Sequence, residues 1–429
     1  MTPLEPLRLW TLWTFLAVSA FAAIEPSPYE FMFGVAILVF GRGGLRFDAM
    51  MSPLIVSLMI FNAAGFLALA PYVDESESVM FTATSFYISL TAMFFAAVVA
   101  ANPAERMKSI RSGYVAAAIL AAVLGDLGYF NVAGLGPYFT LYDNARAMGP
   151  FKDPNVFGPF LVPPIVWLCQ DMLTGRAPIL STTLKLLVVL LGVLLSFSRG
   201  AWIDTACSLA MLLALMGATA STPRLRRRTV TLAAFGLLFV AALLLIALAV
   251  PEIRETALSR ASLVQDYDAG EQGRFGNQLR SIPMLLERPL GFGPFRFAKF
   301  FPADPHEVFL SAFASFGWIG GLAFAAFIAA TLYIGWALCF RRSPLQLEII
   351  ALWSALLPQI LQGVQIDTSH WRHLFLMCGC LYGLAAAVRL ERPQSASPSP
   401  GLRPPPNPRA ATAPTAPSGE SAEGWRWMS

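Results

Sequence analysis

Few ionisable side chains of this 429-residue chain are placed where they could do chemistry, and Arg199 is the clearest of them. It stands in a short polar step, 196–202, between two apolar runs that are each about long enough to cross a bilayer. The loop charges described below place this turn on the outer face, where short loops normally avoid Arg and Lys. An arginine held there at membrane depth is costly to keep, and its default interpretation is a site for an anion.

The second candidate is His306, in the sequence Asp304-Pro305-His306-Glu307. This order predicts a helix start, with Asp304 as N-cap, Pro305 in the first helical position and Glu307 completing a capping box. His306 would then lie in the first turn, where the positive helix end favours a neutral imidazole that can accept a proton from a hydroxyl. The alternatives are that His306 is an ordinary surface histidine and that Glu307 is only a structural cap.

The composition requires these residues to be positioned by membrane helices. The chain is 56% hydrophobic and only 13% charged, which excludes an ordinary soluble globule, and its net charge of +4 gives no argument for a nucleic-acid partner. Apolar runs of span length recur almost end to end, so we predict an all-α, polytopic integral membrane helical bundle of about twelve transmembrane helices. The predicted spans lie near 9–24, 28–41, 53–71, 79–101, 110–130, 155–173, 179–197, 201–219, 229–250, 306–338, 345–364 and 371–389.

Short loops predict the orientation of the bundle. Basic residues gather in alternate short loops, which indicates the cytoplasmic side and puts both termini there. The opposite side then receives the Arg199 turn, one large loop at 251–305, and a turn with His370, Arg372 and His373. We expect a membrane domain over residues 1–390 and, over 391–429, a disordered cytoplasmic tail rich in Pro, Ser and Ala. The basic loop residues are Arg42, Arg46, Arg106, Lys108, Arg111, Arg176, Arg224, Arg226, Arg227, Arg228, Arg341 and Arg342.

Other polar residues are weaker candidates. Asp266 and Asp268 could bind a divalent cation beside a diphosphate, although the nearby glycines favour a polar loop. Asp126 and Asp204 are acids within predicted spans, which either pair with an arginine or tune the site. We expect neither a metal nor a cofactor.

Four segments together resemble the bacterial O-antigen ligase and O-antigen polymerase superfamily of membrane glycosyltransferases. Their order, spacing and common outer placement carry the resemblance, which covers roughly residues 130–330. One departure is Glu307, because the family usually has Asn after the loop histidine. The segments are Phe151-Lys-Asp-Pro-Asn155; Ser198-Arg199-Gly200; Arg274 followed by Pro289-Leu-Gly291-Phe-Gly293; and His306 with Phe309-Leu310 and Gly317-Trp-Ile-Gly320.

The resemblance implies a fold similar to C-type glycosyltransferases and a bacterial inner-membrane location. It also implies transfer of a glycan from undecaprenyl diphosphate to a sugar hydroxyl outside the cytoplasm, by an inverting reaction without a metal. Arg199 and Arg274 would hold the diphosphate and His306 would take the proton of the acceptor hydroxyl. We assign further substrate contacts to Arg280, Asp153, Asn155, Glu307 and Arg372.

The acceptor stays open at this point. A polymerase, which we favour slightly, extends another lipid-linked glycan in exopolysaccharide or O-antigen synthesis, whereas a ligase transfers the polymer to lipid A-core. Other expected partners are membrane lipids and other polysaccharide export proteins. The rival class is a multi-span transporter of an anionic solute, against which stand the missing internal repeat and the single large outer loop.

Overall fold

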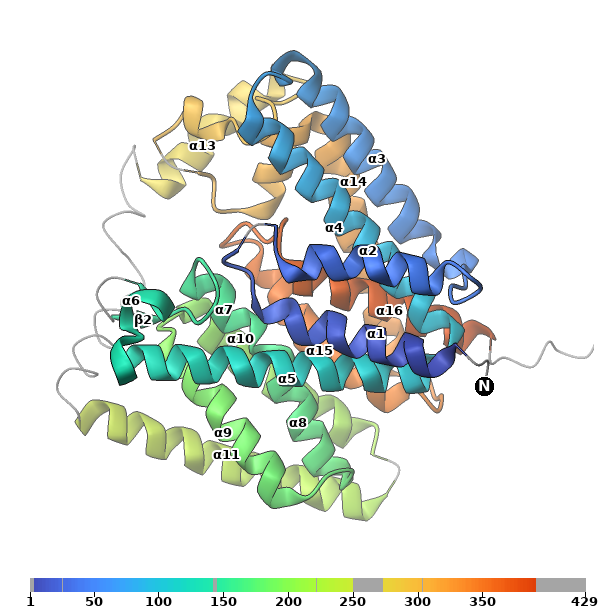
Figure 1. The fold of residues 1–429 in the computed structure, drawn as a ribbon, viewed down its shortest axis with the longest axis vertical. Coiled ribbons are helices and arrows are strands. Elements are labelled where there is room, and N and C mark those ends of the chain that lie inside the picture. The colour runs from blue at the N-terminus through green and yellow to red at the C-terminus, as the bar shows by residue number, and fades with distance from the viewer. Residues whose placement is uncertain are drawn as a thin grey trace, which may run out of the picture. The chain divides into compact units, whose positions relative to one another are not determined.

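The computed structural model describes residues 4–24, 26–141, 145–220, 222–249, 273–302 and 304–390 (Figure 1). All of them belong to one compact unit, Met1–Glu391. The expected tail and the paired aspartates, Asp266 and Asp268, lie outside the described residues.

The predicted all-α membrane bundle is confirmed, because helical structure covers each of the twelve predicted spans. Seven helices of the described part are long and apolar enough to cross a membrane. The chain therefore forms a polytopic integral membrane protein. The spans correspond to α1 (Glu5–Ala17), α2 (Pro28–Phe40), α3 (Ser52–Leu69), α4 (Ser76–Ala101), α5 (Pro103–Tyr129), α7 (Pro154–Phe160) with α8 (Val162–Thr174), α9 (Ile179–Leu195), α10 (Arg199–Ala218), α11 (Pro223–Ala249), α14 (Val308–Cys339), α15 (Gln346–Gln362) and α16 (Arg372–Leu390).

Shorter elements join these helices. Two of them are the strands β1 (Thr140–Leu141) and β2 (Arg146–Ala147), which pair antiparallel. The others are the helices α6 (Gly136–Phe139) and α13 (Arg274–Leu286) and the 3₁₀ helices η1 (Val18–Ala20), η2 (Ala49–Met51), η3 (Ala70–Tyr72), η4 (Val132–Gly134) and η5 (Phe297–Lys299).

Local sequence explains where several helices begin. Proline opens α2, α5, α7 and α11, where its fixed φ suits the first turn and its missing amide hydrogen is no loss. A side chain caps the helix that follows at Asp153 for α7 and at Ser198 for α10. Pro159 interrupts the span that starts at α7, because a proline inside a helix removes a hydrogen bond and the chain restarts as α8.

The two ends of the bundle differ in chemistry. We call the end at which α1 begins and α16 finishes the basic end, and the opposite end the loop end (Figure 1). At the basic end, buried ion pairs join the helices: Arg106 to Glu5 at 2.9 Å, and Arg111 to Asp171 at 3.0 Å and Glu348 at 2.7 Å. Arg106 and Arg111 each pair with a carboxylate of another helix, so these charges hold helix ends together.

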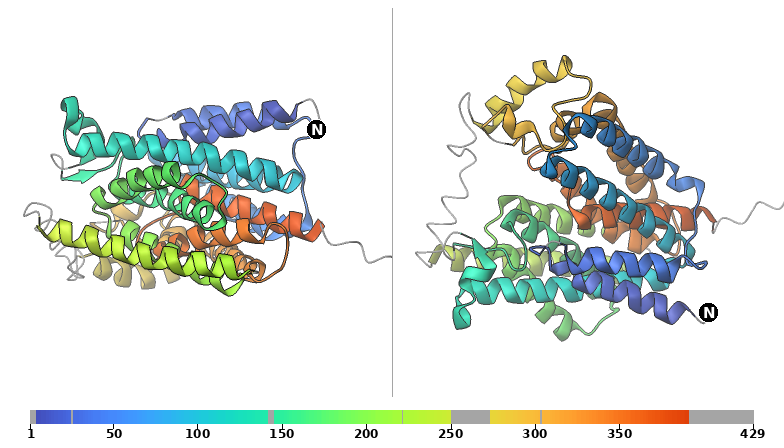
Figure 2. Two further views of the ribbon diagram at one scale, coloured as in Figure 1. Left: turned by 90° about the horizontal axis from the view of Figure 1, so that it is seen from below. Right: turned by 45° about the horizontal axis from the view of Figure 1, so that its top comes forward.

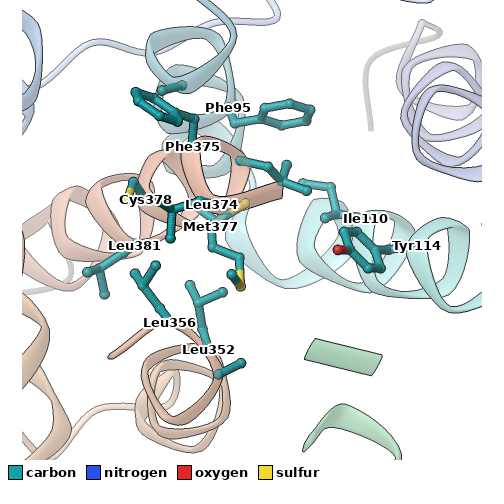
Figure 3. Packing of buried hydrophobic residues seen from close by; sticks show 14 of the residues in the cluster. Phe95, Ile110, Tyr114, Leu352, Leu356, Leu374, Phe375, Met377, Cys378 and Leu381 are labelled. Atoms are coloured by element: carbon teal, nitrogen blue, oxygen red, sulfur yellow. The ribbon is translucent and has the colours of Figure 1, made fainter. Parts of the chain in front are cut away.

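The core is built around α16, whose residues from 373 to 388 are buried. Leu374, Phe375 and Leu381 of this helix face a cluster that includes Phe95 of α4 and Leu356 of α15 (Figure 3). Small residues let the backbones approach closely, as membrane helices require. The packed core holds the ends of α15 and α16 in place at the loop end, where the candidate residues lie.

Connections from distant parts of the sequence meet at the loop end (Figure 2). The amide of Ala22, after α1, donates to the carbonyl oxygen of Pro150 at 3.0 Å. The hydroxyl of Ser78, at the start of α4, donates to the carbonyl oxygen of Pro294 at 2.8 Å. The first bond ties the loop before α2 to the loop before α7, and the second ties the loop before α14 to the start of α4.

Candidate active site at the loop end

Arg199 is the first residue of α10 and is half-buried. The hydroxyl of Ser198 accepts a hydrogen bond from the Ala201 amide and caps the helix. Phe197 turns the chain with a φ of +47°, in the left-handed region. The Ser198-Arg199-Gly200 segment therefore makes a tight turn that fixes the guanidinium at the helix start.

The first turn of α10 packs directly against the end of α15. A side-chain carbon at Gly200 would overlap the amide group of Gln362 in its present position, which shows how closely the two helix ends approach. The next residue, Gly363, accepts a hydrogen bond at 2.8 Å from the Val308 amide, at the start of α14. The end of α15 thus lies between the Arg199 turn and the segment that contains His306.

The helix α13 reaches the same place from the large loop. Gln278 donates a hydrogen bond at 2.5 Å to the carbonyl oxygen of Pro305, next to His306. Arg274 precedes Gln278 by four residues, which puts the two positions on one helix face. The side chain of Arg274 lies outside what is described, but its backbone position belongs to the face turned toward His306.

The predicted helix start at Asp304 is wrong. The first residue of α14 is Val308, and Glu307 is its N-cap, with carboxylate oxygens that accept from the amides of Phe309 (3.0 Å) and Leu310 (2.5 Å). Glu307 has an extended backbone and takes the N-cap position itself, so its side chain satisfies the amides of the second and third residues of α14. His306 consequently lies before the helix, exposed, with a φ of +48°.

Acidic groups surround His306. Asp367, in the turn after α15, accepts a hydrogen bond at 2.5 Å from Ser311 in the first turn of α14. Loss of hydration raises the pKa of Asp304, the charge of His306 lowers it, and the charge of Asp367 raises it further. Asp304 is therefore coupled electrostatically to both His306 and Asp367.

Arg146 is a site residue that the sequence did not single out. Its side chain is buried, and it donates at 2.9 Å to both the carbonyl oxygen of Ser196 and the amide oxygen of Asn155. Arg146 thereby joins two of the family-like segments, one before α7 and one before α10. Its only sequence signal was a position in the outer connection 131–154, upstream of those segments.

Arg280 is placed differently from the other predicted contacts. Its guanidinium donates to the side chain of Asn277 at 2.6 Å and lies 5.9 Å from the ring centre of Phe301. Six residues separate Arg280 from Arg274, so their directions on the helix differ by about 120°. Arg280 therefore packs on the aromatic cluster of its own loop, away from the face that meets Pro305.

Two predicted contacts line a cavity of about 700 Å³ at the loop end. These are Asp153, whose carboxylate caps α7, and Arg372, at the start of α16. Arg372 forms an ion pair with Glu30 and lies 5.7 Å from the ring centre of Tyr29. Arg199 and His306 are not among the lining residues, so the structure separates the predicted contacts into two neighbouring groups.

The two glycine-containing segments of the family resemblance pack on each other. Gly317 interrupts α14 with a φ of +68°, and a side chain there would overlap the carbonyl oxygen of Pro289. Gly291, with a φ of +73°, would likewise overlap the carbonyl oxygen of Ala314. We call residues 289–293 together with 317–320 the glycine clamp. It holds the large loop on α14, so close packing accounts for the glycines of these two segments.

The large loop is also fastened to α4. Glu75, the N-cap of α4, pairs with Arg296 and, at 2.9 Å, with Lys299. Hydrogen bonds from these two cations lower the pKa of Glu75 to about 2. The carboxylate therefore stays ionised, and the attachment persists, across the physiological pH range.

The fold described above is that of a polytopic integral membrane protein. Comparison with known protein families narrows the class of protein further. Residues 184–325 match the model of the O-antigen ligase family, which confirms the resemblance to the O-antigen ligase and polymerase superfamily. The chain is accordingly a glycosyltransferase-type membrane enzyme. The matched range contains Arg199, Arg274 and His306, but not Asp153 or Arg372. A search of curated proteins found no match.

Proposed function

We propose that this protein transfers a glycan from undecaprenyl diphosphate to a sugar hydroxyl at the periplasmic face of a bacterial inner membrane. Arg199 and Arg274 bind the diphosphate, and His306 accepts the proton of the attacking hydroxyl. Asn155, held by Arg146 beside the Arg199 turn, and Glu307, next to His306, are the nearest polar contacts for the substrates.

One observation carries the proposal. Three separate elements converge around the end of α15: Gly200 on Gln362, Val308 on Gly363, and Gln278 on the residue before His306. Each element brings one of the three proposed residues. A guanidinium that binds an anion and an imidazole that binds a proton are thereby positioned at one end of the bundle.

The reaction balances without a further reagent. The acceptor oxygen forms a bond to the anomeric carbon on the side opposite the diphosphate, so the configuration inverts. The bond from this carbon to the diphosphate oxygen breaks, and its electron pair stays on the diphosphate. The proton of the hydroxyl passes to His306. Arginines stabilise the charge that grows on the leaving group, at about 2–4 kcal/mol for each contact in a partly dehydrated site.

The sidedness follows from the positive-inside rule: the basic end faces the cytoplasm with both termini, and the loop end faces the periplasm. Reporter fusions at Gly270 and at Ser221 should therefore report opposite sides of the membrane. Reports from the same side would remove the proposed location of the site.

The acceptor decides between two forms of this function. A polymerase, the form we favour slightly, extends another lipid-linked glycan in exopolysaccharide or O-antigen synthesis, whereas a ligase uses lipid A-core. The direct test supplies purified protein with an undecaprenyl-diphosphate-linked oligosaccharide and each acceptor in turn, with no metal added.

The assay runs in detergent, where no ion gradient exists. Consumption of the donor with release of undecaprenyl diphosphate supports the proposal, and the acceptor that is glycosylated identifies the form. A protein that consumes no donor, but moves an anionic solute across vesicles, would be the transporter instead. Arg280→Ala is the matched control, because Arg280 packs on Phe301 and should be dispensable for donor turnover.

A further inference from the structure

The cavity at the loop end exists because the first helical hairpin is short. Gly113 of α5 packs against Trp13 and Leu16 near the end of α1. From this level α1 and η1 continue only to Ala20, whereas α5 continues to Tyr129, about three turns further. The α1–α2 hairpin therefore ends short of the outer end of α5, as Figure 1 shows, and residues of its tip line the cavity.

The cavity volume, about 700 Å³, is of the size that small-ligand sites have in proteins, about 300–1,000 Å³. Its walls come from the hairpin tip, the start of α4, the segment before α7 and the turn before α16. Aromatic side chains form much of the lining, with Tyr29, Phe81, Phe160 and Trp371 among them. Flat apolar faces of this kind pack well against the C–H faces of sugar rings.

The charged side chains that line the cavity show which classes of ligand it disfavours. The charged lining residues are Lys152, Arg372, which is paired with Glu30, and the carboxylates of Glu77, Asp153 and Asp367. Acids outnumber cations in this set, which is unfavourable for a phosphate. Charged walls also disfavour a lipid chain, because burial against hydrocarbon would leave them unsolvated. Carboxylates and aromatic faces together suit a ligand with many hydroxyl groups.

Two lining residues have unmet hydrogen-bonding capacity. The Tyr29 hydroxyl and Nε2 of His373 are buried without a partner in the described structure. The two side chains are 1% and 4% exposed, so bulk water does not compensate for the missing bonds. A buried polar atom without a partner is costly, and both of these atoms belong to residues of the cavity lining.

We infer that this cavity is the binding site for the sugar units of the acceptor glycan, separate from the arginines that hold the donor diphosphate. The inference rests on the proposed function. It assigns Asp153, Arg372 and both partnerless groups to the acceptor and leaves Arg199 and Arg274 to the donor. Asp367 belongs to both regions, since it lines the cavity and binds Ser311, the fourth residue of the helix that follows His306. A glycan in the cavity therefore approaches the proposed base from the side of the 363–371 turn.

Chemical protection tests occupancy of the cavity. Met80 lines it, whereas the adjacent Val79 does not, and both are exposed. Met80→Cys and Val79→Cys would be made in a Cys207→Ser background, because Cys207 is the exposed cysteine among the five. Each purified protein would be labelled with a charged methanethiosulfonate reagent. The probes are the free acceptor oligosaccharide, released from its lipid by mild acid, and undecaprenyl diphosphate without sugar.

The free oligosaccharide should slow labelling at Met80→Cys at least about threefold, leave Val79→Cys unchanged, and be more effective than undecaprenyl diphosphate. Protection by undecaprenyl diphosphate alone would assign the cavity to the donor and overturn the inference. Absence of protection by either probe would also overturn it. Because labelling needs no turnover, these results stay readable even if the transfer assay fails and the proposed function is wrong.

A matched pair of tyrosines supplies a kinetic test. Tyr29 and Tyr87 both carry a buried hydroxyl without a partner, but only Tyr29 lines the cavity. Tyr29→Phe should raise the KM for the acceptor about 3- to 10-fold, the value of one hydrogen bond, and leave the KM for the donor unchanged. Tyr87→Phe should change neither constant. Equal effects of the two substitutions, or a raised KM for the donor, would contradict the assignment.

Discussion

Two regions at α14 differ in how closely they are packed. The glycine clamp lies where the helix is interrupted, and the 304–307 segment lies before its first residue. The clamp is packed so closely that a side chain at Gly291 or Gly317 would overlap a carbonyl oxygen of the facing segment. In the 304–307 segment, by contrast, His306 is exposed in a left-handed conformation that is uncommon for a residue with a side chain. Both segments belong to the same family resemblance, so the comparison separates residues needed for folding from those proposed for chemistry.

The largest expected effect falls on the chemical side of this comparison. Arg199→Ala should reduce donor turnover by about 10²–10³-fold, the loss typical of one charge-stabilising contact. Arg199→Lys should be nearly as damaging, because one ammonium cannot reproduce the planar two-pronged contact of a guanidinium. The measurement is donor turnover at equal amounts of folded protein. Near-normal turnover by the lysine variant would mean that Arg199 serves as a packing charge, like the arginines of the basic end.

The clamp should respond in the opposite way. Gly317→Ala forces a side chain into a backbone conformation that is essentially restricted to glycine, at a cost of about 1–3 kcal/mol before the overlap with Pro289 is counted. We expect lower yield and a lower unfolding temperature, with normal turnover per folded molecule. Gly34→Ala is the control, since that position has open space within α2. If Gly317→Ala folded normally but turned over no donor, the clamp would have a chemical role.

A smaller effect concerns pH and the turn that joins the two regions. Enclosure lowers the pKa of His370 from its ordinary value of 6.5; nearby Asp367 raises it and Arg372 lowers it further. The neutral form, which bonds to Ser85 at 2.7 Å, is thus the form that the fold favours. Its contribution to stability is complete above pH 6.5 and is lost as the pH falls through the lowered pKa.

His370→Gln should remove that dependence, because the amide cannot be protonated in this range. Thermal unfolding of the detergent-solubilised protein at about pH 7.5 and 5.5 measures it. Between these two pH values, the unfolding temperature of the wild type should fall further than that of the variant. Identical losses would show that His370 contributes nothing to acid sensitivity.

The membrane helices were predictable because each span is visible in the local sequence as an apolar run bounded by proline, glycine or charge. The helix start near His306 was not, because Asp304 and Glu307 are both good N-cap residues and the sequence does not say which one is used. The contact of Val308 with Gly363 involves residues more than fifty positions apart, so no local pattern could place it. The sequence motifs identified the candidate residues but did not show which of them lie close together in the fold.

Arg146 and the cavity likewise could not be predicted from the local sequence. Arg146 is one arginine among many until its bonds to Ser196 and Asn155 are seen. His370 and His373 lie outside the family-like segments, and only the structure shows that both line the cavity. That cavity depends on the relative lengths of α1 and α5, which is a tertiary property.

His306 is the residue on which the proposed reaction depends most directly. As the proposed base it lies before α14, outside the packed core, so His306→Ala should leave expression and unfolding temperature unchanged. Loss of a general base typically lowers the rate about 10²–10⁴-fold. Donor turnover by the purified variant, across about pH 5.5 to 8 where histidine titrates, measures this loss. We predict that lipid-linked donor remains unprocessed throughout; more than about half of wild-type turnover, well outside the general-base range, would contradict the assignment.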